Sequence, residues 1–203
     1  MSKPTTNTRG YFDHSFVYLQ RFLPMTRQQF KMLEPLLELR SFEKRIMIVK
    51  EGEIEDYVNL VIKGLVRKFV PTSKGEFTQQ LATEGHIIQS EISFHTRKPS
   101  EVVIETLEPS VLMSIKNDNM QRAFELVPGA EELGRAIVTQ MFIKKDARYF
   151  DQLKKTTRER FLDYMKNHPH MLQRVPQKIL ASYLDIKPET FSRLKHLIRV
   201  PGS

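Results

Sequence analysis

The sequence predicts an α+β protein in which a strand-rich N-terminal part precedes a helical C-terminal part. Between Ser41 and Ile115, short β-branched and aromatic runs alternate with turn residues, a pattern typical of a β-sandwich or barrel. From Asp118 onward the apolar spacing becomes helical. The last stretch, Pro176 to Ile198, predicts two short helices around a three-residue turn, which is the pattern of a helix-turn-helix.

Composition restricts the class of protein. The 203 residues suit two modest domains, and a hydrophobic content of 40% is sufficient for a core. No apolar run approaches the roughly 18 residues of a membrane helix, and Met1 to Gly10 is polar, so we expect a cytoplasmic protein without membrane contact. Because the chain has no cysteine, we expect no metal site with thiolate ligands, no cysteine-held iron–sulfur cluster and no cysteine nucleophile.

The N-terminal part is expected to contain a helix and then strands. Thr26 and Gln29 have the spacing of a capping box, in which the two side chains satisfy free amides at a helix start. This helix should continue to about Leu36. Six strand-like runs follow, at residues 46–49, 57–62, 65–70, 77–81, 102–104 and 111–115.

The helical part is expected to begin with a second capping box, Asp118 with Gln121, and its first helix should end at Pro128. A long helix should then run from Glu131 to about Leu153. Residues near a three-four spacing on this helix are candidates for a dimer interface: Leu133, Ile137, Gln140, Ile143, Ala147 and Phe150. Packing of the helix on its own barrel is the alternative, and one helix can do both.

A third capping box, Thr156 with Glu159, opens the C-terminal domain. Its first helix should end at His168, because Pro169 disfavours helical geometry in the residue before it. We therefore expect three parts, namely residues 1–129 for the strand-rich domain with flanking helices, 130–154 for the long helix, and 155–203 for the C-terminal domain.

Positive charge is concentrated in the C-terminal domain. Residues 151–203 hold eleven lysines and arginines and five acids, so six of the eight net positive charges lie there. This distribution favours an anionic partner, and a solvated basic surface explains it equally well.

The second helix of the helix-turn-helix pattern begins with Pro188, whose missing amide would be unpaired at a helix start in any case. Arg193 can donate two bonds to guanine and Glu189 can accept one from cytosine, while other outward side chains can contact phosphates. The outward positions are Lys187, Glu189, Thr190, Ser192, Arg193, Lys195, His196 and Arg199. An ordinary amphipathic hairpin with a solvated polar face is the alternative.

Two stretches resemble a known family, in the family's own order. Ile48–Glu53 followed by Tyr57–Gly64 is similar to the signature of cyclic-nucleotide-binding jelly rolls, and Lys187–Arg193 resembles the recognition-helix motif of Crp/Fnr regulators. The resemblance implies an N-terminal double-stranded β-helix (jelly-roll) sensor domain, a long dimerisation helix and a C-terminal helix-turn-helix. Only Val200–Ser203 follow the recognition helix, so we expect the domain to lack a full wing.

The same resemblance implies function and partners. It implies a transcription regulator that binds double-stranded DNA as a homodimer and recognises an inverted repeat. RNA polymerase and an unidentified small-molecule effector are further candidate partners. Lys187 at the start of the recognition helix is a poor cap, and we expect it to contact a phosphate instead.

The effector pocket departs from the family pattern. Relatives that bind cyclic nucleotides carry a Gly-Glu pair and, further along, an arginine that neutralises the cyclic phosphate. Here Ser90 replaces the glycine, Glu91 matches the acid, and Glu101 falls where the arginine is expected, so a carboxylate would repel the phosphate. Arg97 and Lys98 are expected to reach toward the pocket. We therefore expect a degenerate pocket that does not bind cyclic AMP in the usual way, and no other cofactor is assigned.

Two other classes of function compete with a DNA-binding regulator. An enzyme is not expected, because no nucleophile elbow, metal motif or phosphate loop accompanies Glu43, Glu53 and Glu91. The remaining alternative is a cyclic-nucleotide or other small-anion sensor that acts mainly through protein–protein contacts. Salt-dependent duplex binding with a sequence-specific component distinguishes the regulator from this sensor.

Overall fold

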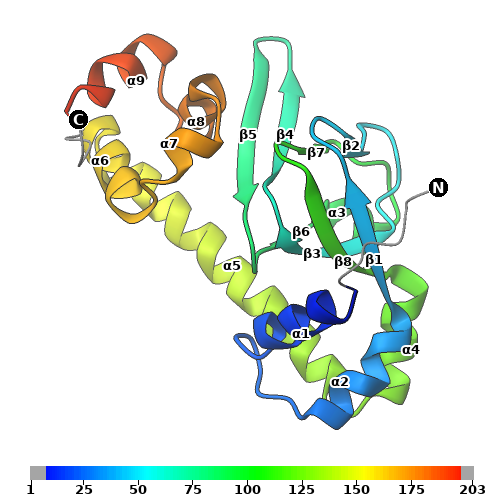
Figure 1. The fold of residues 1–203 in the computed structure, drawn as a ribbon. Coiled ribbons are helices and arrows are strands. Elements are labelled where there is room, and N and C mark those ends of the chain that lie inside the picture. The colour runs from blue at the N-terminus through cyan, green and yellow to red at the C-terminus, as the bar shows by residue number, and fades with distance from the viewer. Residues whose placement is uncertain (1–7, 198–203) are drawn as a thin grey trace.

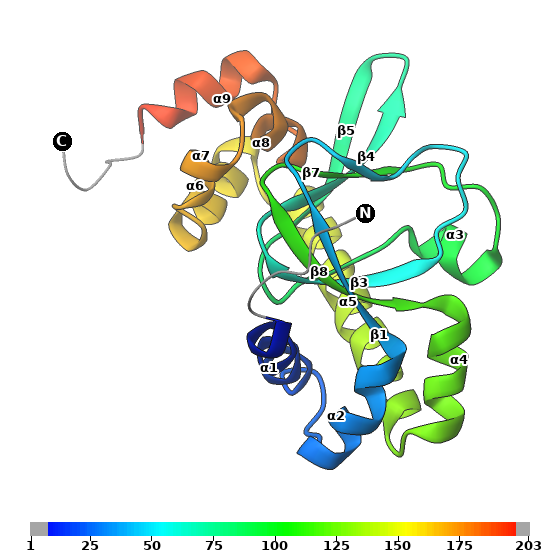
Figure 2. The same cartoon turned by 45° about the vertical axis from the view of Figure 1, so that its right-hand side comes forward.

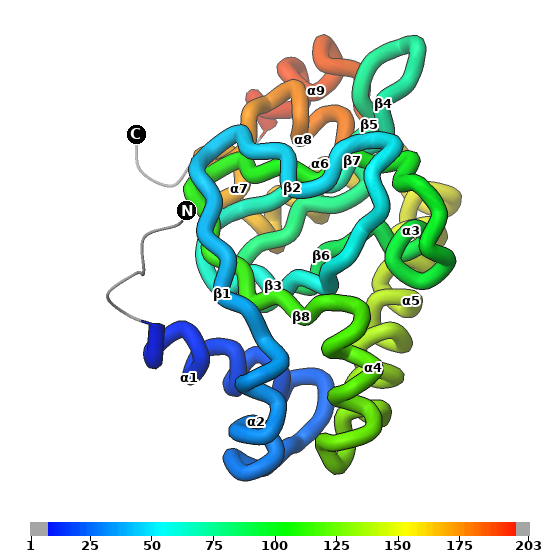
Figure 3. The backbone as a smooth tube through the Cα atoms, turned by 90° about the vertical axis from the view of Figure 1, so that its right-hand side faces the viewer, coloured from blue at the N-terminus to red at the C-terminus, as the bar shows by residue number. Residues whose placement is uncertain are grey.

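The computed structural model describes residues 8–197 and shows a β-barrel with helices at both ends (Figure 1). Helices α1, α2 and α4 lie at one end, the C-terminal helices lie at the other, and the long helix α5 runs alongside the barrel between them (Figures 2 and 3). Arg199 and the segment Val200–Ser203, on which the expected absence of a wing depends, lie outside the described residues.

The barrel consists of two four-stranded sheets, which confirms the predicted jelly roll. One sheet has the order β1 (Leu37–Phe42), β8 (Ser110–Lys116), β3 (Tyr57–Lys63), β6 (Ile87–Ile88). The other has the order β2 (Met47–Val49), β7 (Val103–Thr106), β4 (Val66–Thr72), β5 (Gly75–Ala82). All of these neighbouring strands are antiparallel.

Strands β1 and β6 are absent from the sequence prediction. Strand β6 has only two residues, Ile87 and Ile88, which pair with Leu60 and Asn59, and a run of two residues carries no periodicity. Helix α3 (Glu91–Thr96) was also not predicted. Gly64, between β3 and β4, has a φ of +97°, and a Cβ there would lie 2.6 Å from the Pro109 carbonyl oxygen, so this turn requires glycine.

Two capping boxes form as predicted. The amide of Thr26 donates to the Gln29 side chain at 2.7 Å at the start of α2 (Arg27–Leu33), and the amide of Thr156 donates to Glu159 at 2.8 Å. Helix α2 is shorter than predicted, however. It ends at Leu33 and gives way to a 3₁₀ turn, Glu34–Leu36, because a proline, Pro35, cannot continue the α-helical hydrogen bonds.

The predicted capping box of Asp118 and Gln121 is wrong. Helix α4 spans Asn117–Leu126, its N-cap is Lys116, and no side chain caps it. Strand β8 continues to Lys116, so the chain enters the helix directly from the sheet, and Asp118 lies within the first turn. An acid in that position still faces the positive end of the helix dipole.

The long helix α5 spans Ala130–Lys154, within one residue of the prediction at each end. Three apolar clusters organise the molecule. One fills the barrel, and a second packs α1 (Thr8–Leu19), α2, α4 and α5 on the outer face of the β1-containing sheet. The third joins α6 (Thr157–Asn167), α7 (Met171–Arg174), α8 (Gln177–Tyr183) and α9 (Pro188–Lys195) to the barrel residues Leu65, Leu81 and Leu107. Within residues 8–197, no helix has the length and apolarity to span a membrane.

Candidate functional site

Helices α8 and α9 form the predicted helix-turn-helix. In the turn between them Asp185 has a φ of +54°, and the amide of Ile186 donates to the Ala181 carbonyl at 2.9 Å. Ala181 is fully buried, as expected for a small residue where two helices approach closely. Helix α7, which precedes α8, was not predicted.

One aromatic pair anchors α9 to the rest of the domain. Phe191 of α9 and Phe161 of α6 are both fully buried, and their rings meet edge to face with centroids 5.1 Å apart. Because Phe191 points inward, its polar neighbours on the helix point outward, and the pair with Phe161 holds α9 against α6.

The candidate DNA-binding residues lie on that outward face. Lys187, Glu189, Ser192, Arg193, Lys195 and His196 are exposed, and Thr190 is half-buried. Within residues 8–197, the Arg193 side chain donates one long bond, 3.4 Å, to Thr190. Ser192 accepts a bond from Gln177 at 2.5 Å, so a residue of α8 that the sequence analysis did not single out belongs to the same surface. Lys187 is the N-cap of α9 without a capping bond, as predicted.

The candidate dimer residues divide between two faces of α5. Leu133 is 6% exposed and belongs to the apolar cluster of its own barrel, on which Ile137 also packs. Gln140 donates to the Arg21 carbonyl at 3.4 Å. The assignment of Leu133 to a dimer interface is therefore wrong, because its side chain is enclosed by its own chain. Ile143, Ala147 and Phe150 are exposed.

A broader apolar face of α5 remains uncovered, and we call it the α5 outer face. Its members are Val138, Phe142, Ile143, Tyr149, Phe150 and Leu153, which are 47–68% exposed. The spacing of Val138, Phe142, Tyr149 and Leu153 places them in one stripe along a helix of 3.6 residues per turn. An uncovered apolar stripe of this length is typical of a helix that pairs with another helix.

The predicted effector residues do not converge on one pocket. Arg97 donates to the Asp56 carboxylate and to the Glu55 carbonyl, and its expected place in an effector pocket stays a prediction. Its backbone adopts a left-handed conformation, φ +58°, at the end of α3. Lys98 and Glu101 are exposed. Ser90 is buried and accepts a bond from the Ser100 hydroxyl at 2.9 Å.

Glu91, in contrast, lies at the centre of a charge cluster that includes a lysine missed by the sequence analysis. Lys68 of β4 is 1% exposed, and its ammonium donates to Glu91 at 2.6 Å and to the Gln89 carbonyl at 3.0 Å. Lys145 of α5 contacts the second Glu91 oxygen at 3.0 Å. Burial raises the pKa of Glu91, but the two lysines outweigh burial and hold that pKa below its ordinary value.

A second buried carboxyl lies beside this cluster. Glu55 is 1% exposed. One of its oxygens accepts a bond from the Tyr57 amide at 2.9 Å, and the other has no hydrogen-bond partner among residues 8–197. Burial raises the pKa of Glu55 from 4.5 to about 7, although backbone amides and Arg40 partly oppose the shift.

The raised pKa of Glu55 makes stability depend on pH. The folded state binds this proton more tightly than the unfolded state, so the stabilisation is complete below pH 4.5 and is lost as the pH rises through about 7. We expect Glu55→Gln, which stays neutral, to gain about 3 kcal/mol of unfolding free energy relative to the wild type between pH 4.5 and pH 8. Urea unfolding of both proteins at the two pH values measures the difference. A difference in unfolding free energy that is the same at both pH values would contradict the raised pKa of Glu55.

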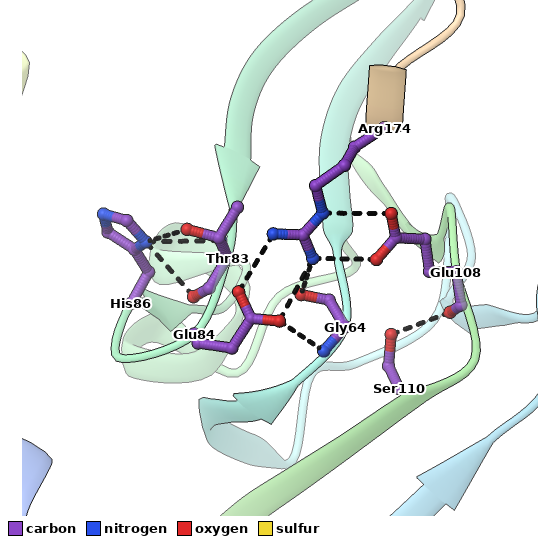
Figure 4. A network of polar contacts seen from close by, with 7 residues as sticks. All are labelled: Gly64, Thr83, Glu84, His86, Glu108, Ser110 and Arg174. Atoms are coloured by element: carbon purple, nitrogen blue, oxygen red, sulfur yellow. Dashed lines mark hydrogen bonds and ion pairs between the residues drawn. The ribbon is translucent and has the colours of Figure 1, made fainter. Parts of the chain in front are cut away.

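An arginine links the C-terminal domain to the barrel (Figure 4). Arg174, at the end of α7, donates to Glu108 at 2.7 and 3.0 Å, to Glu84 at 3.1 Å, and to the Gly64 carbonyl at 3.1 Å. The bonds to Glu108 and then Glu84 raise the pKa of Arg174. These two acids come from two different loops of the barrel, so the Arg174 guanidinium connects α7 with both loops.

Helix α8 contacts the edge strand β5 directly. The Thr78 amide donates to the Ser182 hydroxyl at 2.8 Å, and that hydroxyl donates to the Glu76 carbonyl at 2.9 Å. Arg148 of α5 donates to the carbonyls of Gln79 and Tyr183. Barrel, long helix and helix-turn-helix therefore meet at one junction.

Comparison with known proteins agrees with this architecture. Residues 39–126 match the model of the cyclic nucleotide-binding domain family. Among the curated proteins, no sequence matches significantly.

Several solved structures have the same fold. The c-di-GMP responsive global regulator CLP of Xanthomonas campestris matches with a TM-score of 0.66 at 16% identity, over 87% of this chain and 96% of that protein. FixK2 of Bradyrhizobium japonicum matches with 0.65 at 19% identity, over 82% and 89%. The catabolite activator protein of Thermus thermophilus matches with 0.56 at 18% identity, over 89% and 85%. At such low identity these matches establish the fold.

Proposed function

We propose that this chain, which has the fold of the Crp/Fnr transcription regulators and carries a cyclic nucleotide-binding domain over residues 39–126, regulates transcription by binding DNA. The observation that carries the proposal is the outward face of α9. The anchored helix presents Glu189, Arg193 and Lys195 to solvent. Glu189 and Arg193 can form hydrogen bonds with base edges, and Lys195 can contact a phosphate.

The second part of the proposal is a homodimer formed through the α5 outer face. Two copies related by a two-fold axis would cover this apolar face and present two α9 helices. A dimer of this kind matches an inverted repeat whose half-sites are one helical turn apart, roughly 34–36 Å. The net charge of +8, most of it in the C-terminal domain, supports attraction to the duplex.

We expect Arg193→Ala and Lys195→Ala to weaken DNA binding in different ways. Arg193→Ala should lose about 1–3 kcal/mol of discrimination between the preferred duplex and a random one, because it removes a base contact. Lys195→Ala should weaken both duplexes alike and reduce the salt slope by about one, because it removes a phosphate contact. Fluorescence anisotropy with both duplexes at several salt concentrations distinguishes the two losses. Equal losses on both duplexes for Arg193→Ala would exclude base recognition by that residue.

The proposed regulator does not bind cyclic AMP in the usual way. The arginine expected to neutralise a cyclic phosphate is replaced by an exposed glutamate, Glu101, and Arg97 is held by Asp56. The acid that matches the family pattern, Glu91, is already paired with Lys68 and Lys145. A cyclic nucleotide would have to displace these ion pairs without gaining an arginine in exchange.

A further inference from the structure

One arginine side chain joins the C-terminal domain to three separate turns of the barrel (Figure 4). Arg174 is the last residue of α7, and the helix-turn-helix begins three residues later, at Gln177. Its guanidinium contacts both oxygens of Glu84 and both of Glu108, at 2.7 to 3.1 Å, and the Gly64 carbonyl at 3.1 Å. These three residues lie in the β5–β6, β7–β8 and β3–β4 turns, respectively.

Buried apolar residues accompany this ion-pair network. Leu65 and Leu107 adjoin two of the turn residues in the chain, and Met171 and Val175 precede and follow Arg174. All four belong to the apolar cluster that joins the C-terminal domain to the barrel. Apolar contact has no direction and permits sliding, whereas bidentate pairing of a guanidinium with a carboxylate fixes the geometry. The bonds of Arg174 therefore determine where the domain lies on this apolar surface.

The covalent connection to α5 is a weaker constraint. Helix α5 ends at Lys154, and the next residue, Lys155, has extended backbone with φ −102° and ψ 139°. Lys155 pairs with Asp151 and Asp163, and both of these acids are exposed, so the pairs contribute little to rigidity. The C-terminal domain can pivot at this joint unless a second contact opposes the motion.

Two other contacts hold α8 through hydrogen bonds to backbone groups of one edge strand, β5. Ser182 bonds to the Thr78 amide and to the Glu76 carbonyl, and Arg148 bonds to the Gln79 carbonyl. These contacts attach the domain along one line, whereas the contacts of Arg174 extend over three turns. Without Arg174 we expect the domain to stay attached at β5 and to pivot there.

We propose that Arg174 is a positioning residue, which fixes the helix-turn-helix on the barrel and thereby determines the half-site separation that the dimer binds. The effect on half-site separation rests on the proposed function, whereas the positioning of the domain does not. Leu133 and Ile137 pack α5 on the same barrel, so a domain fixed on the barrel is also fixed relative to the second copy. Each added base pair moves a half-site by about 3.4 Å and about one tenth of a turn. A dimer with fixed domains therefore binds both half-sites at one separation and loses the second contact at others.

The first measurement reports the position of the domain without DNA. Because the chain has no cysteine, spin labels can be attached at Glu125→Cys in α4 and Lys166→Cys in α6, both exposed, with labelled protein diluted into unlabelled protein. The control is Arg158→Gln, which removes an exposed arginine of α6. The distribution of spin–spin distances should be narrow in the wild-type background and in the control. It should be about twofold wider in Arg174→Gln, because the domain pivots at its joint.

The second measurement compares duplexes that carry two copies of the selected half-site at separations two base pairs apart, together with a duplex that carries one half-site. By fluorescence anisotropy, the wild type and Arg158→Gln should prefer one separation by about tenfold or more in Kd. Arg174→Gln should reduce this preference to about threefold or less, while its affinity for the single half-site stays within about twofold of the wild type. A general loss of structure would instead weaken binding to the single half-site.

Glu84→Gln/Glu108→Gln should have the same two effects, because it removes both ion pairs and keeps Arg174, and it decides the outcome if Arg174→Gln does not fold. An unchanged distance distribution in the variants without these ion pairs, or equal widening in Arg158→Gln, would overturn the positioning role. A wider distribution with an unchanged preference for one separation would overturn the role in half-site separation. A wider distribution without duplex binding by the wild type would reject the proposed function and support the positioning role.

Discussion

Phe142→Glu is expected to convert the homodimer into monomers and to lower affinity for an inverted-repeat duplex by about a hundredfold or more. Phe142 is 68% exposed, the largest exposed fraction of any member of the α5 outer face. A carboxylate at that position would be buried against the apolar face of the second copy without a partner, which costs several kcal/mol. A monomer has one recognition helix. It therefore loses the increase in DNA affinity that comes from binding two half-sites at once.

Sedimentation and duplex-binding measurements on the same preparation test this expectation. Met32→Glu is the matched control, because Met32 of α2 is also exposed, at 43%, and lies outside the α5 outer face. The control should remain dimeric and bind like the wild type. A dimeric Phe142→Glu variant, or a monomeric one with wild-type DNA affinity, would contradict the proposed interface.

Phe191→Ala is expected to lower the unfolding free energy of the C-terminal domain by about 3–5 kcal/mol and to abolish sequence-specific DNA binding. Phe191 is fully buried, and it packs edge to face on Phe161. Truncation would leave a cavity under α9 and remove the contact that orients its outward face. The barrel has its own apolar clusters and should stay folded.

Urea unfolding, followed by the far-UV signal and by amide exchange in α9, measures the effect of this substitution. Leu197→Ala serves as the control, because Leu197 also belongs to the C-terminal domain but is 49% exposed, and it should cost well under about 1 kcal/mol. A Phe191→Ala protein with wild-type stability would show that α9 is oriented by other contacts.

Most of the predicted caps and the helix-turn-helix were correct, whereas helices α1, α3 and α7 were not predicted. Two of three capping boxes and the helix-turn-helix formed as expected, because each is decided by residues a few positions apart. The box at Asp118 failed for a nonlocal reason, since pairing of β8 with its neighbours extends the strand to Lys116 and determines where α4 begins. Strand β6 likewise exists only because β3 pairs with it.

The effector pocket and the dimer face depend on contacts between distant parts of the chain. Local sequence patterns do not show these contacts. Helical spacing showed that α5 has apolar residues on more than one side, but it could not show that Leu133 faces the barrel and Phe142 faces solvent. The position of Lys68 in the sequence could have identified it as a pocket residue. It lies two residues after the buried Val66 and therefore on the same side of β4, where an apolar residue is expected.

Selection of bound duplexes from a randomised pool tests sequence-specific DNA binding, the central claim, most directly. The account predicts enrichment of an inverted repeat with half-sites about one helical turn apart, because a two-fold dimer presents two α9 helices at that separation. Failure to enrich any motif would contradict a sequence-specific DNA-binding function for this chain.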